Sequence, residues 1–100
     1  MVKHIVCWKL KELAEGKSKS ENLQIMQQKL NSLKSLPMVV ELEVGTTIAS
    51  ADSSNNDIVL VTVFKSLADL KAYQVHPEHQ KVGEFVNKIK DTRACVDFEF

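Results

Sequence analysis

Four side chains close to apolar helix and strand faces could carry acid and base chemistry. The chain has three histidines and one tyrosine, which are His4, His76, His79 and Tyr73. An imidazole titrates near neutral pH, so each histidine could serve as a general base or orient a substrate. A phenol can donate a hydrogen bond to a carbonyl oxygen. Without a cofactor, Tyr73 could therefore donate a hydrogen bond to a substrate carbonyl while His79 removes a proton from the substrate.

Each of these side chains also has a purely structural explanation. His4 shares strand parity with Val6 and could be a hydrogen-bonded histidine at the edge of the core. His76 directly precedes Pro77, which is the position of a residue that caps a helix. A buried tyrosine such as Tyr73 usually finds a hydrogen-bond partner inside the protein. Both explanations stay open, and we retain His4 and His76 as candidate ligand-binding residues.

Gly83 predicts either empty space or a close contact beside His79. It lies four residues beyond His79, on the same side of a helix whose apolar residues recur at helical spacing. A glycine inside a helix costs about 1 kcal/mol relative to alanine, so its presence needs a reason. It could leave volume for a small molecule, or it could let the helix approach the sheet closely. Gly83 is therefore a third candidate ligand-binding residue.

The sequence offers little sign of a metal, disulfide or phosphate site. His76 and His79 straddle the predicted helix start, and no carboxylate or cysteine spacing completes a ligand set around them. Cys7 and Cys95 are too few for a disulfide framework and lack the paired spacing of a zinc site, so we expect both to be reduced and buried. No phosphate loop or nucleophile motif is recognisable. We expect no cofactor.

Length and charge restrict the class of protein further. One hundred residues predict a single domain over residues 1–100. Thirteen Lys and Arg balance thirteen Asp and Glu, which disfavours nucleic acid and anionic membranes as partners. No apolar stretch approaches the roughly 20 residues that span a bilayer, and the first ten residues lack the core of a signal peptide. We expect a cytoplasmic protein.

Hydrophobic periodicity predicts the order strand, helix, strand, strand, helix pair, strand. The predicted elements cover residues 2–10, 18–36, 39–48, 58–64, 66–89 and 93–100. This order is typical of the ferredoxin-like split βαβ fold, β-α-β-β-α-β, an α+β class with an antiparallel four-stranded sheet. Strands 2–10 and 58–64 are apolar on both faces, as the two central strands should be. Because helices cover one face only, we expect a second copy to pack sheet to sheet in a homodimer.

Four segments resemble one known family over essentially the whole chain. They are residues 2–11 (VKHIVCWKLK), 61–64 (VTVF), 70–79 (LKAYQVHPEH) and 96–98 (VDF). Together they resemble the stress-responsive A/B barrel domain, or Dabb, family, and the Tyr-x-x-His-Pro-x-His string is the most recognisable part. The resemblance implies a ferredoxin-like homodimer, a dimeric α/β barrel in which the two sheets meet.

The resemblance also implies roles for individual residues. One plant relative is a polyketide cyclase that performs an aldol condensation without a cofactor, and its Tyr and His acid and base pair matches Tyr73 and His79. Its pocket-lining strand histidine matches His4, whereas a further strand histidine of the cyclase is replaced here by Ile58. Some plant relatives bind Mg²⁺ through main-chain carbonyls at the end of the first helix, and the matching positions are Leu33, Leu36 and Val39.

Three functions follow as hypotheses. The first is a dimer of unassigned precise function that binds a small, partly apolar molecule between sheet and helices, with Tyr73 and His79 at the pocket mouth. The second is a cofactor-independent enzyme for cyclisation or isomerisation, in which His79 is the base and Tyr73 the hydrogen-bond donor. The third is a purely structural, stress-protective dimer.

Overall fold

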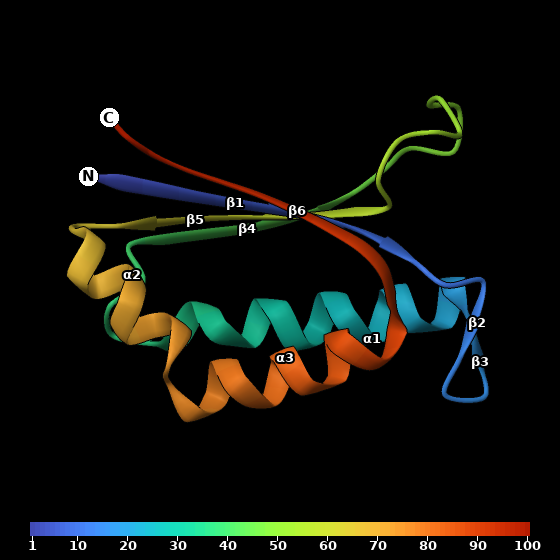
Figure 1. Cartoon of the computed structure of the whole chain (residues 1–100), viewed down its shortest axis with the longest axis horizontal. Helices are drawn as coiled ribbons and strands as arrows, with labels where there is room; N and C mark the ends of the chain where they lie inside the picture. The colour runs from blue at the N-terminus through green and yellow to red at the C-terminus, as the bar shows by residue number, and fades with distance from the viewer.

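A single antiparallel sheet with all helices on one side forms the body of the protein. The computed structural model describes all 100 residues, and Figure 1 shows α1, α2 and α3 against the same face of the sheet. The elements are β1 Val2–Leu10, β2 Leu13–Ala14, β3 Lys17–Ser18, α1 Lys19–Ser32, the 3₁₀ helix η1 Leu33–Ser35, β4 Glu41–Thr46, β5 Ile58–Phe64, α2 Leu67–Gln74, α3 Pro77–Ile89 and β6 Lys90–Glu99.

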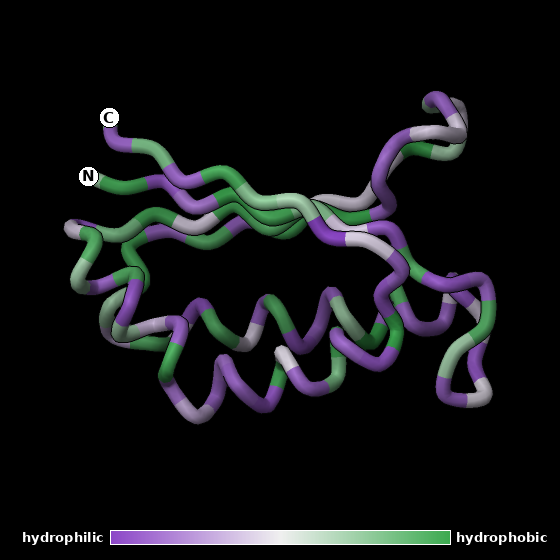
Figure 2. The backbone as a smooth tube through the Cα atoms, in the orientation of Figure 1, coloured by the Kyte–Doolittle hydropathy of each residue, from purple (hydrophilic) through white to green (hydrophobic).

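The strand order confirms the predicted ferredoxin-like fold. The four strands run β4-β5-β1-β6, and every neighbouring pair is antiparallel. The two strands that are apolar on both faces, β1 and β5, are therefore the central ones, and the alternating strands β4 and β6 lie at the edges. Figure 2 shows hydrophobic residues concentrated along the strands and on the helix sides that face them.

Local sequence signals determine where the helices begin. The Ser18 hydroxyl accepts a hydrogen bond from the Glu21 N–H, and the Glu21 carboxylate accepts one from the Ser18 N–H, each at 3.2 Å. This reciprocal pair is a capping box. The helix gives way to the 3₁₀ turn η1 after Ser32, shortly before Pro37.

A short hairpin, β2–β3, was not predicted. Glu15 and Gly16 form its turn with φ angles of 54° and 71°. Two consecutive residues with positive φ suit a tight two-residue hairpin, and glycine adopts this conformation without strain. Strands of two residues are too short to produce a recognisable alternation in the sequence.

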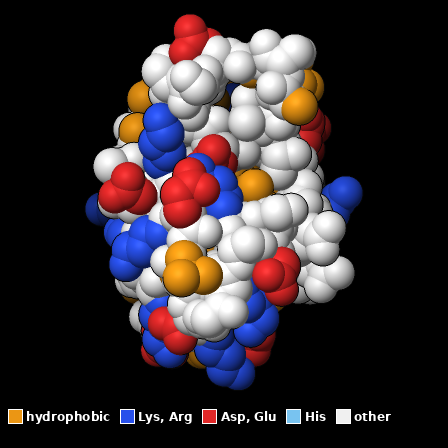
Figure 3. Space-filling view, turned by 90° about the vertical axis from the view of Figure 1, so that its right-hand side faces the viewer, with side chains coloured by type: hydrophobic (Ala, Val, Ile, Leu, Met, Phe, Trp, Pro, Cys, Tyr) orange, Lys and Arg blue, Asp and Glu red, His pale blue; other side chains and the backbone are white.

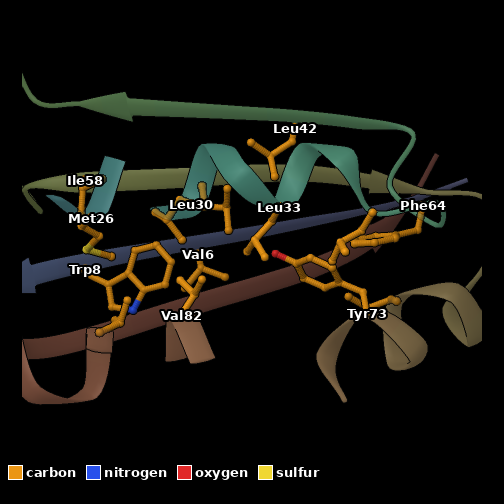
Figure 4. Packing of buried hydrophobic residues seen from close by; sticks show 14 of the residues in the cluster. Val6, Trp8, Met26, Leu30, Leu33, Leu42, Ile58, Phe64, Tyr73 and Val82 are labelled. Carbon is orange, nitrogen blue, oxygen red and sulfur yellow. The ribbon is translucent and has the colours of Figure 1, made fainter. Parts of the chain in front are cut away.

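The core lies between the sheet and the helices. Alternate residues of β1 are buried on the helix side, whereas those between them are half-buried on the other, open face. Figure 4 shows part of the cluster, in which Trp8 from β1 lies near Met26 and Leu30 from α1 at one end, and Phe64 from β5 lies beside Tyr73 from α2 at the other. The cluster contains 17 buried hydrophobic residues.

The last strand presents its polar side to the helices. In register, Asp97 lies opposite His4 and Cys95 opposite Val6, so both share the helix side of the sheet. Val96 and Phe98 point to the open face, where they are 61% and 41% exposed. The open face is therefore apolar across its centre and right to its β6 edge.

Candidate functional site

A cavity of about 210 Å³ lies between the sheet and helices α1 and α3. Its apolar wall comes from the two central strands, helices α1 and α3, and the start of η1, through Val6, Trp8, Leu30, Leu33, Leu60, Val82 and Val86. The remaining lining residues are His4, His79, Gly83, Asn87 and Arg93. An apolar wall with a few polar groups is typical of a small-molecule site.

Gly83 borders open space. A Cβ atom added at this residue would meet nothing within 4 Å, and Gly83 lines the cavity together with His79. Of the two explanations for this glycine, the structure favours empty volume over a close contact between helix and sheet. The glycine thus widens the cavity beside an imidazole.

Tyr73 buries a hydroxyl that has no hydrogen-bond partner. Its residue exposure is 0%, and the hydroxyl oxygen is both enclosed and unpaired. Figure 4 shows this oxygen pointing toward Leu33 and Val6, two residues of the cavity wall. Burial raises the pKa of Tyr73 above its ordinary value, so the phenol keeps its proton and remains a donor. Tyr73 lies behind the cavity wall and is not itself a lining residue.

His79 is in ring contact with Tyr73. The two ring centroids are 4.5 Å apart in an edge-on arrangement. Burial is the main cause that lowers the pKa of His79, and the neighbouring His4, Arg93 and His76 lower it further, while the backbone carbonyl of Gln74 opposes the shift. The imidazole is therefore neutral near pH 7 and able to accept a proton.

His4, on the central strand β1, is the second histidine at the cavity. It is 2% exposed, lines the cavity, and lies edge-on to Tyr73 with 6.5 Å between ring centroids. Its Nδ1–H donates a hydrogen bond to the Asp97 carboxylate from β6. This partner satisfies one ring nitrogen and fixes the orientation of the ring.

His76 lies apart from these residues. Its Nδ1 accepts a hydrogen bond from the Glu78 N–H at 3.1 Å, and it is the N-cap of α3 with Pro77 at the first helical position. His76 does not line the cavity. The structural explanation for this histidine is therefore the one that the geometry supports.

Three residues near the cavity were missed by sequence reasoning. Asn87 and Arg93 line it, and Asp97 holds His4. Asn87 lies four residues beyond Gly83 on α3, so helical spacing could have indicated it. Arg93 and Asp97 could be placed only with the register between β1 and β6.

The carbonyls of Leu33, Leu36 and Val39 fit a Mg²⁺ site poorly. The Leu33 carbonyl accepts the Leu36 N–H at 3.2 Å, and the Leu36 carbonyl accepts the Val39 N–H at 3.1 Å. Mg²⁺ prefers carboxylates and near-ideal octahedral geometry, whereas this set has three neutral carbonyls, two of them already engaged. A metal site at these three residues stays a prediction.

The two cysteines are free, but they are not buried as predicted. Cys7 is half-buried on the open face and Cys95 is exposed on β6. The expectation failed for Cys95 because β6 is an edge strand whose helix-side residues extend beyond the area that the helices cover.

One end of the molecule carries mixed charges. In the view of Figure 3, acidic and basic side chains are interspersed over this end, with hydrophobic atoms in small separate groups. This end therefore presents no single-sign patch to a polyanion. None of the helices has the length and apolarity needed to span a membrane.

Solved structures define the class of protein. A dimeric protein of unknown function with a ferredoxin-like fold from Bacteroides fragilis is 34% identical, with a TM-score of 0.79 over 99% of this chain and 95% of that one. A hydroxynitrile lyase from Passiflora edulis has the same TM-score of 0.79 at 16% identity, over 97% of this chain and 90% of that one. The fold is thus the ferredoxin-like α+β fold.

The family follows from the sequence match. Residues 2–100 match the Stress responsive A/B Barrel Domain, so the chain belongs to that family. The stress-response A/B barrel domain-containing protein DABB1 of Arabidopsis thaliana is 29% identical in an alignment of 102 positions that covers 98% of this chain and 46% of that protein. The chain therefore spans about half the length of this relative.

Proposed function

We propose that the protein is a homodimer in which each chain binds one small, partly apolar molecule in the cavity between sheet and helices. His79, which lines the cavity, supplies a polar contact at one end of that molecule. The Tyr73 hydroxyl, directly behind Leu33 and Val6, supplies a second contact when these wall side chains shift on binding, and no cofactor takes part. The observation that carries the proposal is the buried, unpartnered hydroxyl of Tyr73 directed toward the wall of the cavity.

An orphaned hydroxyl of this kind argues for a ligand. A buried polar group without a partner costs about 1–3 kcal/mol, and most such groups in folded proteins are satisfied. A bound molecule with a carbonyl or hydroxyl oxygen near Leu33 would provide the partner that Tyr73 lacks. The cost is then borne in the free protein and recovered on binding.

The size of the cavity restricts the ligand. Sites for drug-sized molecules are roughly 300–1,000 Å³, and a dry cavity of about 150 Å³ accepts benzene. A volume of about 210 Å³ therefore suits a molecule with one ring and a few further atoms. Arg93 and Asn87 give one side of the cavity hydrogen-bond donors that an oxygen substituent can use.

A second candidate function is supported by the contact between Tyr73 and His79. A neutral imidazole beside a protonated phenol can remove a proton from the carbon next to a carbonyl, while the phenol donates to the enolate oxygen that forms. Returning the proton to another carbon completes an isomerisation. In an aldol cyclisation, the enolate carbon instead attacks a second carbonyl, and the alkoxide that forms takes the proton back from the imidazolium. The lyase from Passiflora edulis supports this candidate only by having an active site on the same fold.

The homodimer rests on the open face of the sheet. Ile5, Val59 and Val61 are half-buried there, although nothing from the same chain covers them. Val96 and Phe98 extend this apolar face to the edge strand. The related protein from Bacteroides fragilis is described as dimeric, which supports a second copy as the cover.

A panel of one-ring phenols and aryl ketones tests the proposal by titration calorimetry and by chromatography of the products. We expect at least one compound to bind wild type, and His79→Ala to weaken binding or abolish turnover with a nearly unchanged melting temperature. Absence of binding across the panel, combined with a large loss of stability in His79→Ala, would instead favour the purely structural dimer.

A further inference from the structure

We propose that His4, Cys95 and Asp97 form a zinc site at the β6 edge of the sheet. The three side chains belong to the two neighbouring strands β1 and β6. Their potential ligand atoms all lie within 4.8 Å of one another. The inference does not rest on ligand binding in the cavity, although His4 belongs to both sites.

Strand geometry brings these residues together. Cys95 and Asp97 are two apart on β6, so both point to the helix side of the sheet. The register of β1 with β6 places His4 directly opposite Asp97, and Cys95 one diagonal step away. A rigid sheet therefore holds all three donors on one face.

The distances suit a tetrahedral ion. Cys95 Sγ is 3.6 Å from His4 Nδ1 and 3.6 Å from Asp97 Oδ1. With zinc–ligand bonds of about 2.0–2.3 Å, tetrahedral geometry places a sulfur and a nitrogen or oxygen ligand about 3.6 Å apart. His4 and Asp97 share a direct hydrogen bond, which the ion has to replace. The half-exposed Asp97 carboxylate, 41% accessible, is free to make that adjustment.

The donor set selects the metal. A thiolate, an imidazole and a carboxylate are all zinc ligands, whereas Mg²⁺ and Ca²⁺ prefer oxygen donors alone. Three protein ligands leave a fourth position for water, the arrangement of an open zinc site. On binding, the Cys95 thiol releases its proton to solvent, and His4 changes tautomer so that its one ring proton is on Nε2 and Nδ1 is free to bind the ion.

The site is accessible and partly preorganised. Cys95 is exposed, whereas His4 is 2% exposed and held by the surrounding core. The three side chains leave the sheet on the side opposite Val96, so the apolar face proposed for the dimer does not cover them. His4 also lines the cavity, so a bound ion lies at the rim of that cavity.

Cobalt(II) substitution tests the site directly, because a thiolate ligand produces a charge-transfer absorption that no oxygen or nitrogen ligand gives. The full chain is titrated with Co²⁺ in a buffer that contains a phosphine reductant, which keeps the thiols reduced. The bound Co²⁺ is then displaced by Zn²⁺. We expect one Co²⁺ per chain with this band in wild type, no band in Cys95→Ser, and affinity weakened roughly 10-fold or more in Asp97→Asn.

Cys7→Ser is the matched control. Cys7 is the other thiol and lies on the open face, so its replacement should leave the band and the affinity unchanged. Both Cys95 and Asp97 are exposed, and their variants should keep the wild-type circular dichroism. The proposal is overturned if wild type gives no thiolate band, if the band survives in Cys95→Ser, or if it disappears in Cys7→Ser.

Discussion

At the scale of single residues, Tyr73 and Gly83 show how the interior departs from a well-filled core. Tyr73 leaves a buried hydroxyl unpaired, and Gly83 leaves space where the side chain of an alanine would fit. Both features reduce the stability of the free protein. Side by side with His79, they are consistent with a region kept for a ligand and not for packing.

Replacement of Tyr73 by phenylalanine distinguishes a ligand-binding role of the hydroxyl from a role in the stability of the fold. Tyr73→Phe removes the unpaired hydroxyl and keeps the ring contacts with Phe64 and His79. We expect the free energy of unfolding to rise by about 1–3 kcal/mol while affinity for the cavity ligand falls. Urea unfolding and calorimetry measure the two effects. A less stable variant would mean that the hydroxyl serves the fold.

His79 predicts a pH dependence of stability. Its folded-state pKa is lowered by burial and by the nearby His4, Arg93 and His76, so the unfolded chain binds a proton first as pH falls below about 6.5. The stabilisation present above that pH is lost as pH falls further. We expect wild type to lose more stability than His79→Gln between about pH 8 and pH 5. Urea unfolding at each pH measures the free energy of unfolding, and equal losses in wild type and His79→Gln would contradict the lowered pKa of His79.

Several residue roles could be predicted and others could not. The motif spacing indicated Tyr73 and His79, because positions on one short segment stay close in any fold. The contact between His4 and Asp97 spans 93 positions, and only the pairing of β1 with β6 creates it. Whether Gly83 leaves empty space or permits a close contact between helix and sheet could be decided only from the positions of the neighbouring atoms.

At the scale of elements, the beginning of α3 depends on His76. Its Nδ1 accepts the Glu78 N–H, one of the donors that has no partner within the helix. His76→Ala should lower the free energy of unfolding by about 0.5–2 kcal/mol. His76→Asp should restore most of it, since a carboxylate caps the same donor. Ligand affinity should be unchanged in both variants, and a selective loss of affinity would return His76 to the binding site.

The strand order was predictable, but the orientation of β6 was not. Alternation shows that a strand has two different faces without showing which of them meets the helices. In β4, Leu42 faces the core and Glu43 the open face. In β6 the polar residue Asp97 takes the helix side, opposite His4. This orientation of β6 places its polar side chains at the rim of the cavity and its apolar side chains on the open face.

At the scale of the whole molecule, the open face of the sheet is an apolar surface that nothing from the same chain covers. We expect the protein to sediment as a dimer at micromolar concentration. Val96→Asp should shift it toward monomer, because it places a charge in the proposed interface. Val75→Asp is the matched control, since Val75 is 67% exposed on the helical layer. A wild-type monomer, or equal dissociation of both variants, would contradict the interface.

The most direct test of the account is to fill the cavity from Gly83. Gly83→Leu extends a side chain into space where no atom lies within 4 Å of the added Cβ, so the fold should be kept or stabilised. Gln80→Leu, at an exposed position of the same helix outside the cavity, is the control. With a one-ring ligand that binds wild type, calorimetry should show binding abolished in Gly83→Leu and intact in Gln80→Leu. Unchanged affinity in Gly83→Leu would contradict a ligand site in this cavity.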